Sequence, residues 1–188
     1  MKPSTPTAAH VIIMVGIPGA GKTTFAEHFT KTFQAPFVNV QAIQAATAIN
    51  DATALVTSNL MLDEIFKTKR TVIYEGPTST KTDRVELIKK ITAAGYSHLL
   101  VWVQTESLEA KRRATKKQAD NSQLSSDEFN AAIQHFQAPS VTEKPIVISG
   151  KHTYNTQLKI VLKHLAGSVR AESTDTPRVR SGRNIIIR

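Results

Sequence analysis

The chain has 188 residues and a formal net charge of +9 at pH 7, a length typical of one domain that holds a sheet with helices on both faces. It contains no cysteine, which excludes disulfides and thiolate metal sites, and its six histidines are scattered without the spacing of metal ligands. The high positive charge favours phosphorylated or nucleic-acid partners, because a positive surface concentrates polyanions.

The chain begins with a segment, 1–9, that we expect to be a disordered lead-in, and the apolar run at 11–15 predicts the first strand. This run is too short for a signal-peptide core or a membrane span, so we expect a soluble, cytoplasmic protein. A glycine-rich segment follows at once. After Thr24, the phenylalanines Phe25, Phe29 and Phe33 recur every four residues, which predicts a helix to about residue 33.

The glycine-rich segment 16–23 reads GIPGAGKT, the spacing of a phosphate-binding loop between a strand and a helix. Its glycines let several backbone N–H groups point at a phosphate, and the helix N-terminus adds its positive dipole end. Lys22 is predicted to reach the β- and γ-phosphates, and the Thr23 hydroxyl to hold Mg²⁺. A chance glycine turn is the alternative, and the position between a strand and a periodic helix argues against it. We therefore predict binding of ATP and Mg²⁺, with the nucleotide contacted by Gly16, Pro18, Gly19, Ala20, Gly21, Lys22, Thr23 and Thr24.

Four further strands are predicted by apolar segments at 37–40, 71–74, 98–103 and 145–148. Helices are predicted from Asp51 or Thr53, from Thr82 or Asp83 to Gly95, over 107–119, after Ser125 and over 156–165. The strand at 98–103 is continuously apolar, so we expect it, with Trp102, to be covered on both faces. The alternation of strands and helices predicts an α/β fold, a doubly wound parallel five-stranded sheet flanked by helices, over 10–166. Ligands are expected at the carboxyl ends of its strands.

The composition changes from Gly167 onward. Residues 170–183 mix Ser, Thr, Asp, Pro and Arg with two apolar residues, too few for a core, which predicts a basic disordered tail over 167–188. Three isoleucines at 185–187 can add as a strand to a sheet edge. A solvated tail and a tail that binds nucleic acid or a protein partner both stay open.

Two more groups are expected to converge on the phosphate loop. Glu75 ends the third strand, where a carboxylate can order Mg²⁺ through water or contact the substrate, and Gly76 behind it is expected to clear room for a ligand. The segment 111–117 holds five cations in seven residues, which predicts a basic helix that folds over the triphosphate as a lid.

With these elements in this order, the chain resembles the AAA-type small P-loop kinases and ATPases grouped around polynucleotide 5′-kinase and the zeta-toxin sugar kinases. The likeness covers roughly residues 10–165 and is carried by the segments VIIMVGIPGAGKTTFAEHF, VIYEGPTSTKTDRVELIKKITAAGYSHLLVWVQTESLEAKRRATKK and KPIVIS. The resemblance implies the fold of nucleoside monophosphate kinases, with ATP and Mg²⁺ as the phosphoryl donor.

The resemblance also implies roles for single residues. The family's third-strand segment corresponds to Glu75, Gly76, Thr78 and Arg84. Its lid arginine follows the acid at the end of the fourth strand by nine residues; Gln104 stands in the place of that acid, and Arg113 lies nine residues on. Arg113 is therefore the leading lid residue, supported by Arg112 and Lys117. The predicted catalytic residues are Lys22, Glu75 and Arg113.

The chain departs from the family where an aspartate and, three residues later, an arginine usually follow the second strand. The matching residues are Gln41 and Gln44. A glutamine amide can orient a hydroxyl or a water but cannot take its proton. Phosphoryl transfer depends more on positioning and charge than on a base, so transfer at a reduced rate is compatible with this change.

Three functions follow as alternatives. The first is an ATP-dependent kinase that acts on a hydroxyl of a nucleotide, a nucleic-acid end or a small metabolite. The second is a slow ATPase or a nucleotide-binding regulator, and the third is a nucleic-acid-binding protein, although no aromatic-rich basic patch supports it. A kinase is expected to have an acceptor pocket lined by the end of the second strand and the segment 45–62, whereas a regulator is expected to fill it with Ile43, Ile49 or Leu55.

Overall fold

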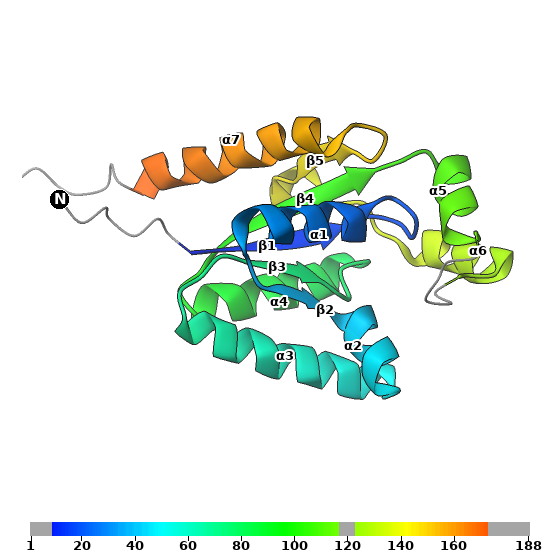
Figure 1. The fold of residues 1–188 in the computed structure, drawn as a ribbon, viewed down its shortest axis with the longest axis horizontal. Coiled ribbons are helices and arrows are strands. Elements are labelled where there is room, and N and C mark those ends of the chain that lie inside the picture. Colours follow the sequence, from blue (N-terminus) through cyan, green and yellow to red (C-terminus); the bar gives the residue numbers. More distant parts are fainter. Residues whose placement is uncertain (1–8, 117–122, 173–188) are drawn as a thin grey trace, which may run out of the picture.

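The computed structural model describes residues 9–116 and 123–172, with side chains to residue 166. Within this part of the chain, the strands form an all-parallel five-stranded sheet in the order β2-β3-β1-β4-β5, with helices on both faces (Figure 1). The strands are β1 (His10–Val15), β2 (Phe37–Asn39), β3 (Val72–Glu75), β4 (Ser97–Gln104) and β5 (Ile146–Ser149). This confirms the predicted fold class.

Strand β1 lies at the centre of the sheet and carries the phosphate loop at its carboxyl end. It pairs with β3 on one side, where Ile13 lies opposite Tyr74, and with β4 on the other, where Val15 lies opposite Trp102. All five residues from Val11 to Val15 are fully buried, as expected for a parallel strand with helices over both faces.

The helices are α1 (Lys22–Phe33), α2 (Val40–Thr47), α3 (Asp51–Lys67), α4 (Lys81–Ala93), α5 (Ser107–Ala114), α6 (Ser126–His135) and α7 (Tyr154–Glu172). Helices α3 and α4 pack on one face of the sheet, and α1 and α7 pack on the other. One core cluster joins alternate residues of β1 to Leu62 and Phe66 of α3 and Ile91 of α4. The other joins the remaining residues of β1 to Phe25 of α1 and Val161 of α7. The 2-residue period of the strand therefore supplies both cores from one strand.

The second strand is shorter than predicted, and helix α2 follows it without a loop. The Asn39 side chain accepts a hydrogen bond from the Ala42 backbone N–H at 3.1 Å, so Asn39 caps the helix and Val40 is its first residue. The next caps also lie upstream of the predicted ones: Asn50 caps α3, and Thr80 caps α4 through a reciprocal pair with Asp83.

Two other helices differ in length from the prediction. Helix α5 ends at Ala114, with Thr115 as its C-cap, and so is shorter than the expected 107–119. Helix α7 continues past Leu165 to Glu172, inside the segment predicted as a tail. The predicted lid residue Lys117 and the isoleucines at 185–187 lie outside the described residues. Among the helices that the structure describes, none is long and apolar enough to cross a membrane.

Helices α5 and α6 form a small unit beyond the carboxyl end of the sheet (Figure 1). Ala110 and Ala114 of α5 pack on Phe129 of α6, and Ile17 of the phosphate loop joins this cluster. The α5–α6 unit, which includes the helix predicted as a lid, is thus packed directly on the loop.

Candidate nucleotide-binding site

The phosphate loop connects β1 to α1 and presents an open helix N-terminus. Gly19 has φ +73°, and a Cβ there would collide with the Ala110 carbonyl of α5, so only glycine fits under the lid helix. Gly21 is the N-cap of α1 in a left-handed conformation, and no side chain caps the helix. The first backbone N–H groups of α1 are therefore open to an anion.

Lys22 places its ammonium inside the loop. Its Nζ donates to the carbonyl oxygens of Gly16 at 2.9 Å and Ile17 at 3.1 Å. Burial lowers the pKa of Lys22 from its ordinary value, and the Glu75 carboxylate acts in the opposite direction. A poorly hydrated ammonium held by two carbonyls is well suited to exchange them for phosphate oxygens.

Glu75 lies beside the loop because β3 is the neighbour of β1. Its Oε1 accepts from the Thr23 hydroxyl at 3.0 Å, and the residue is 5% exposed. Its Oε2 is buried without a hydrogen-bond partner among the described residues. Burial raises the pKa of Glu75, against the opposing effects of Lys22 and the Thr23 hydrogen bond. A hydroxyl and an unpaired carboxylate oxygen are hard oxygen donors of the kind that Mg²⁺ prefers, so these residues fit that ion.

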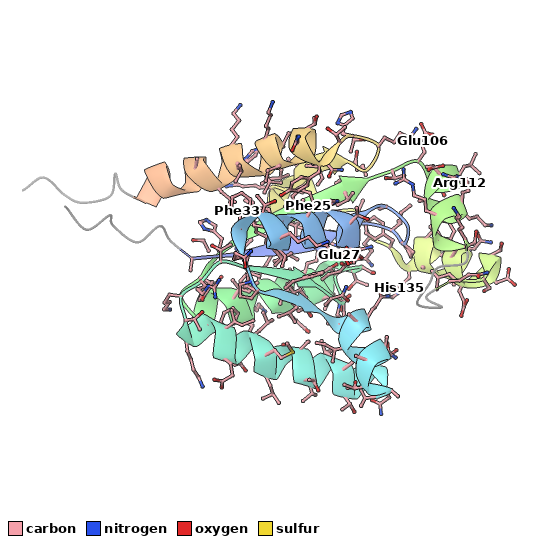
Figure 2. The ribbon with its side chains drawn as sticks, in the orientation of Figure 1. Phe25, Glu27, Phe33, Glu106, Arg112 and His135 are labelled. Atoms are coloured by element: carbon pink, nitrogen blue, oxygen red, sulfur yellow. The ribbon has the colours of Figure 1, made fainter. Side chains whose placement is uncertain are left out.

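The two predicted lid arginines, Arg112 and Arg113, both bind the Glu109 carboxylate, but only Arg113 also reaches the phosphate loop. Glu109 accepts from Arg112 and from Arg113 Nε at 2.8 Å, and these hydrogen bonds lower the pKa of Glu109 to about 2. Arg113 Nη1 also donates to the Gly150 carbonyl at 3.1 Å, close to Gly21 of the loop. Arg112 is largely exposed, at the lid end of the molecule with Glu106 and His135 (Figure 2). The structure therefore brings Arg113, rather than Arg112, to the loop.

A cavity of about 140 Å³ opens beside Gly21 and Arg113. Its lining is Gly21, Thr24, Phe25, His28, Arg113, Gly150, His152, Tyr154 and Gln157. The His28 and Tyr154 rings stack with centroids 5.0 Å apart, and Gln157 donates to the Ser149 carbonyl at 2.8 Å. The sequence did not indicate His28, Tyr154 and Gln157 as site residues, because α1 and α7 meet only in the folded chain and share no motif.

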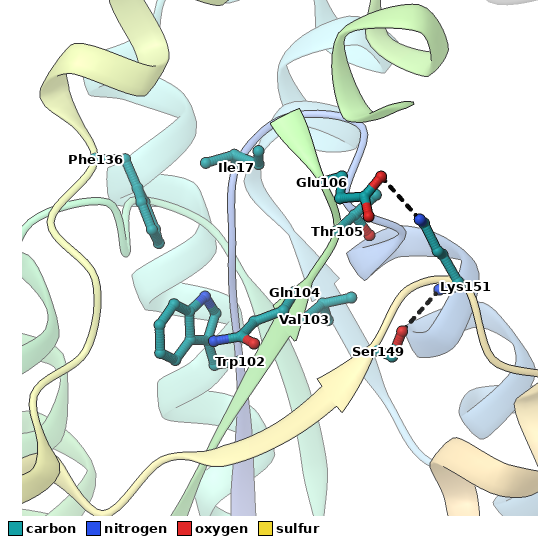
Figure 3. Close-up of a pocket in the computed structure, with 9 residues that line it drawn as sticks. All are labelled: Ile17, Trp102, Val103, Gln104, Thr105, Glu106, Phe136, Ser149 and Lys151. Carbon is teal, nitrogen blue, oxygen red and sulfur yellow. Dashed lines mark hydrogen bonds and ion pairs between the residues drawn. The ribbon is translucent and has the colours of Figure 1, made fainter. Parts of the chain in front are cut away.

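A larger cavity, about 470 Å³, lies at the carboxyl ends of β4 and β5 (Figure 3). Its lining is Ile17, Trp102, Val103, Gln104, Thr105, Glu106, Phe136, Ser149 and Lys151. Trp102 was expected to be covered on both faces, but it is partly exposed: its side chain packs on the core cluster of α3 and α4 and also lines this cavity. We refer to it below as the β4–β5 cavity.

Two residues of the segment that follows β3, Arg84 and Gly76, have structural roles. Arg84 is fully buried and donates to Glu143 at 2.6 Å and to the carbonyls of Thr78 and Gln137, so it is not available to a ligand. A Cβ on Gly76 would collide with the Tyr74 ring and with Val40, so this glycine makes room for the protein's own side chains and not for a ligand.

The region where the acceptor was expected is occupied by the protein. Ile43 and Ile49 are half-buried and pack on the core cluster of α3 and α4. Gln41 is exposed on α2, and the Gln44 amide donates to Asp51. This arrangement is the one that sequence reasoning associated with a regulator.

Comparisons with known proteins agree with the fold. The crystal structure of a putative kinase from Chloroflexus aurantiacus J-10-fl superposes with a TM-score of 0.68 at 15% identity, over 86% of this chain and 98% of the other. A gluconokinase from Sinorhizobium meliloti 1021 matches with a TM-score of 0.62 at 11% identity, over 91% and 98%. An APS kinase of Mycobacterium tuberculosis, solved in complex with AMPPNP and APS, matches with a TM-score of 0.65 at 15% identity, over 86% and 99%.

At these identities the structural likeness shows the fold, and it agrees with the resemblance to small P-loop kinases. A search of curated protein sequences finds no significant match. The family model described as an AAA domain matches residues 11–139, from β1 through α6, and thus includes the phosphate loop, Glu75 and the lid. The chain therefore belongs to this AAA domain family.

Proposed function

We propose that the protein is an ATP-dependent phosphotransferase that acts on a hydroxyl of a nucleotide, a nucleic-acid end or a small metabolite. The observation that carries this proposal is the convergence of Lys22, Thr23, Glu75 and Arg113 at one end of the sheet. Family membership and the likeness to small kinases support it.

Lys22, Thr23, Glu75 and Arg113 would each have a separate role in phosphoryl transfer. Mg·ATP, when bound, supplies the transferable phosphoryl group. Lys22 would bind phosphate oxygens in place of the Gly16 and Ile17 carbonyls, and Thr23 and Glu75 would hold the ion. Arg113 would neutralise charge from the lid side, and such preset charges are the main source of catalysis in phosphoryl transfer. The small cavity beside Gly21 would take the base, against the stacked His28 and Tyr154 rings.

A slow ATPase or nucleotide-binding regulator is the second candidate. The packing of Ile43 and Ile49 into the core and the hydrogen bond between Gln44 and Asp51 favour it. Both candidates require ATP binding at the loop, and they differ in whether the phosphoryl group reaches an acceptor or water.

The first experiment is calorimetric titration of Mg·ATP into the wild type, Lys22→Ala and Lys31→Ala. Lys31 is an exposed lysine on the same helix and serves as the matched control. We expect Lys22→Ala to weaken ATP binding by about 100-fold, because it removes charge-assisted hydrogen bonds, and Lys31→Ala to leave it unchanged. Equal affinity in all three proteins would refute the proposal.

Transfer assays then separate the two candidates. Radiolabel from γ-labelled ATP is followed into nucleosides, oligonucleotide 5′ ends and sugars, and into free phosphate. Label in an acceptor supports the phosphotransferase, whereas label in phosphate alone supports the ATPase.

A further inference from the structure

We infer that the β4–β5 cavity, where Trp102 and Phe136 face the Gln104 amide next to the phosphate loop, is the acceptor site and binds a neutral nucleoside. This inference rests on the proposed phosphotransferase function and names its acceptor. Four features of the cavity carry it: its position, its aromatic wall, its unpaired polar groups and its charge.

The cavity shares a wall with the phosphate loop. The Ile17 side chain lines it, while the Ile17 carbonyl accepts from Lys22 Nζ at 3.1 Å. Thr105 also lines the cavity, and its hydroxyl donates to the Ala20 carbonyl of the loop at 2.9 Å. The cavity is therefore adjacent to the loop that would bind the phosphates, with Ile17 and Thr105 between them.

One wall of the cavity is aromatic. Figure 3 shows the Trp102 and Phe136 side chains on one side and Glu106 and Lys151 on the other. Neither Trp102 nor Phe136 contacts another aromatic ring within the described part of the chain. Both side chains are partly buried and pack on the core cluster of α3 and α4, so their positions are fixed. Ring surface that is left beside a cavity can stack on a ligand, and a planar base is the ligand group that uses such a surface best.

The polar groups near this wall are also unpaired. The Gln104 side chain and the Trp102 indole N–H have no hydrogen-bond partner among the residues that the structure describes. The Gln104 backbone is held in place because its carbonyl accepts from Gly150 N–H at 2.8 Å. An amide offers both a donor and an acceptor, the combination that reads the edge of a base.

The charge of the lining favours a neutral ligand. Among the lining residues, Glu106 and Lys151 are the charged ones, and they pair with each other at 2.9 Å. Both side chains of the pair are exposed, 48% for Lys151 and 76% for Glu106, so the pair sits at the mouth of the cavity and leaves its lining without an unpaired charge. The volume of about 470 Å³ lies within the usual range of small-molecule sites.

The transfer step balances without a further reactant. A ribose hydroxyl oxygen forms a bond to the γ-phosphorus of ATP. The bond from that phosphorus to the β–γ bridging oxygen breaks with its electron pair, ADP leaves, and the hydroxyl proton passes to solvent. Loose phosphoryl transfer of this kind needs positioning more than a strong base, which suits a site where the unpaired polar side chain beside the aromatic wall is a glutamine.

Trp102 is the only tryptophan of the chain, so its fluorescence reports directly on this cavity. The wild type is titrated with adenosine, guanosine, cytidine and uridine, and with glucose and gluconate as comparators without a base. We expect a saturable change with at least one nucleoside and none with the two comparators. Absence of a nucleoside response in a protein that binds ATP would overturn the inference and leave the proposed function intact.

Variants of Phe136 and Gln104 test whether these side chains of the β4–β5 cavity bind the nucleoside. We expect Phe136→Ala and Gln104→Ala each to weaken nucleoside binding about tenfold, the loss of one stacking or paired polar contact. Phe33→Ala, which removes an exposed ring from α1, is the control and is expected to leave binding unchanged. Equal affinity of Phe136→Ala and the wild type would contradict the stacking role.

Lys22→Ala separates the two proposals. We expect this variant to bind ATP about 100-fold more weakly, as above, and to keep the Trp102 response to nucleoside, because Ile17 still forms the wall. In transfer assays, Phe136→Ala is expected to raise KM for the nucleoside more than it lowers kcat. A nucleoside that binds but receives no phosphoryl group, while another compound does, would overturn the acceptor assignment.

Discussion

At the scale of single residues, Glu75 is the most informative side chain. A buried carboxylate with one oxygen unpaired costs folding free energy, and its pKa is raised by that burial. A buried carboxylate of this kind is kept only where the surrounding structure holds it in place, and such residues are common at functional sites. The orphaned oxygen beside Thr23 and Lys22 is thus better explained by a bound cation than by stability.

We predict that Glu75→Gln raises the unfolding temperature at pH 7 and lowers Mg²⁺-dependent ATP turnover by about 100-fold. Glutamine keeps the hydrogen bond from Thr23 and removes the buried charge. Because the folded-state pKa of Glu75 lies above its ordinary value of 4.5, the wild type gains stability as the pH falls through that raised pKa. The difference between the two proteins should therefore shrink from pH 7 to pH 4.5.

Thermal unfolding across this pH range is the measurement, with the exposed Glu86→Gln of α4 as control. A stable, fully active Glu75→Gln would show that the carboxylate has no part in the reaction.

At the scale of elements, Arg84 joins three segments that the sequence keeps apart. Arg84 lies in α4. It donates to Glu143 of the 3₁₀ turn η1 (Val141–Glu143), to the carbonyl of Thr78 in the segment that follows β3, and to the carbonyl of Gln137 in the segment that follows α6. The ion pair is almost fully buried, and the hydrogen bond from Arg84 lowers the pKa of Glu143 to about 2. This arginine therefore holds the segment that carries Phe136.

We predict that Arg84→Met and Glu143→Gln each destabilise the fold by about 3–5 kcal/mol, because each leaves a buried polar partner unpaired. The double variant should be less destabilised than the sum of the two. Since the pKa of Glu143 falls from 4.5 to about 2 on folding, its contribution is present above pH 4.5 and is lost as the pH falls toward 2.

Urea unfolding at pH 7 and pH 3 measures both effects, with Glu64→Gln, from an exposed ion pair, as the control that should change little. Additive effects of the two core variants would show that Arg84 and Glu143 act independently.

At the scale of the whole molecule, the three core clusters of the described residues, with the side chains packed around them, lie within residues 9–165. We predict that removal of residues 173–188 leaves the unfolding temperature unchanged, because every core residue that the structure describes is kept. The cut falls after Glu172 so that α7 stays complete. Calorimetry of the two proteins is the measurement, and a fall of several degrees would show that the isoleucines at 185–187 pack on the domain.

The sequence alone determined the parts of this protein that depend on local pattern. The phosphate loop, all five strands and the helices with regular apolar spacing follow from periodicity and from the glycine spacing of 16–23. Helix α2 was missed because its cap, Asn39, sits at the end of a three-residue strand, where a continued strand is equally compatible with the residues. The pairing of Thr23 with Glu75 was predictable, since the carboxyl ends of parallel strands meet at one edge.

Only the tertiary structure decided which polar side chains are buried in contacts that stabilise the fold and which lie where a ligand could contact them. Arg84 and Arg113 look alike in sequence, yet one is buried in an ion pair and the other lies beside the loop. Trp102 was predicted to be covered, but it is partly exposed and lines a cavity together with Phe136. The reason is physical: burial and hydrogen-bond partners come from residues far apart in the chain, and no local pattern of residues records those contacts.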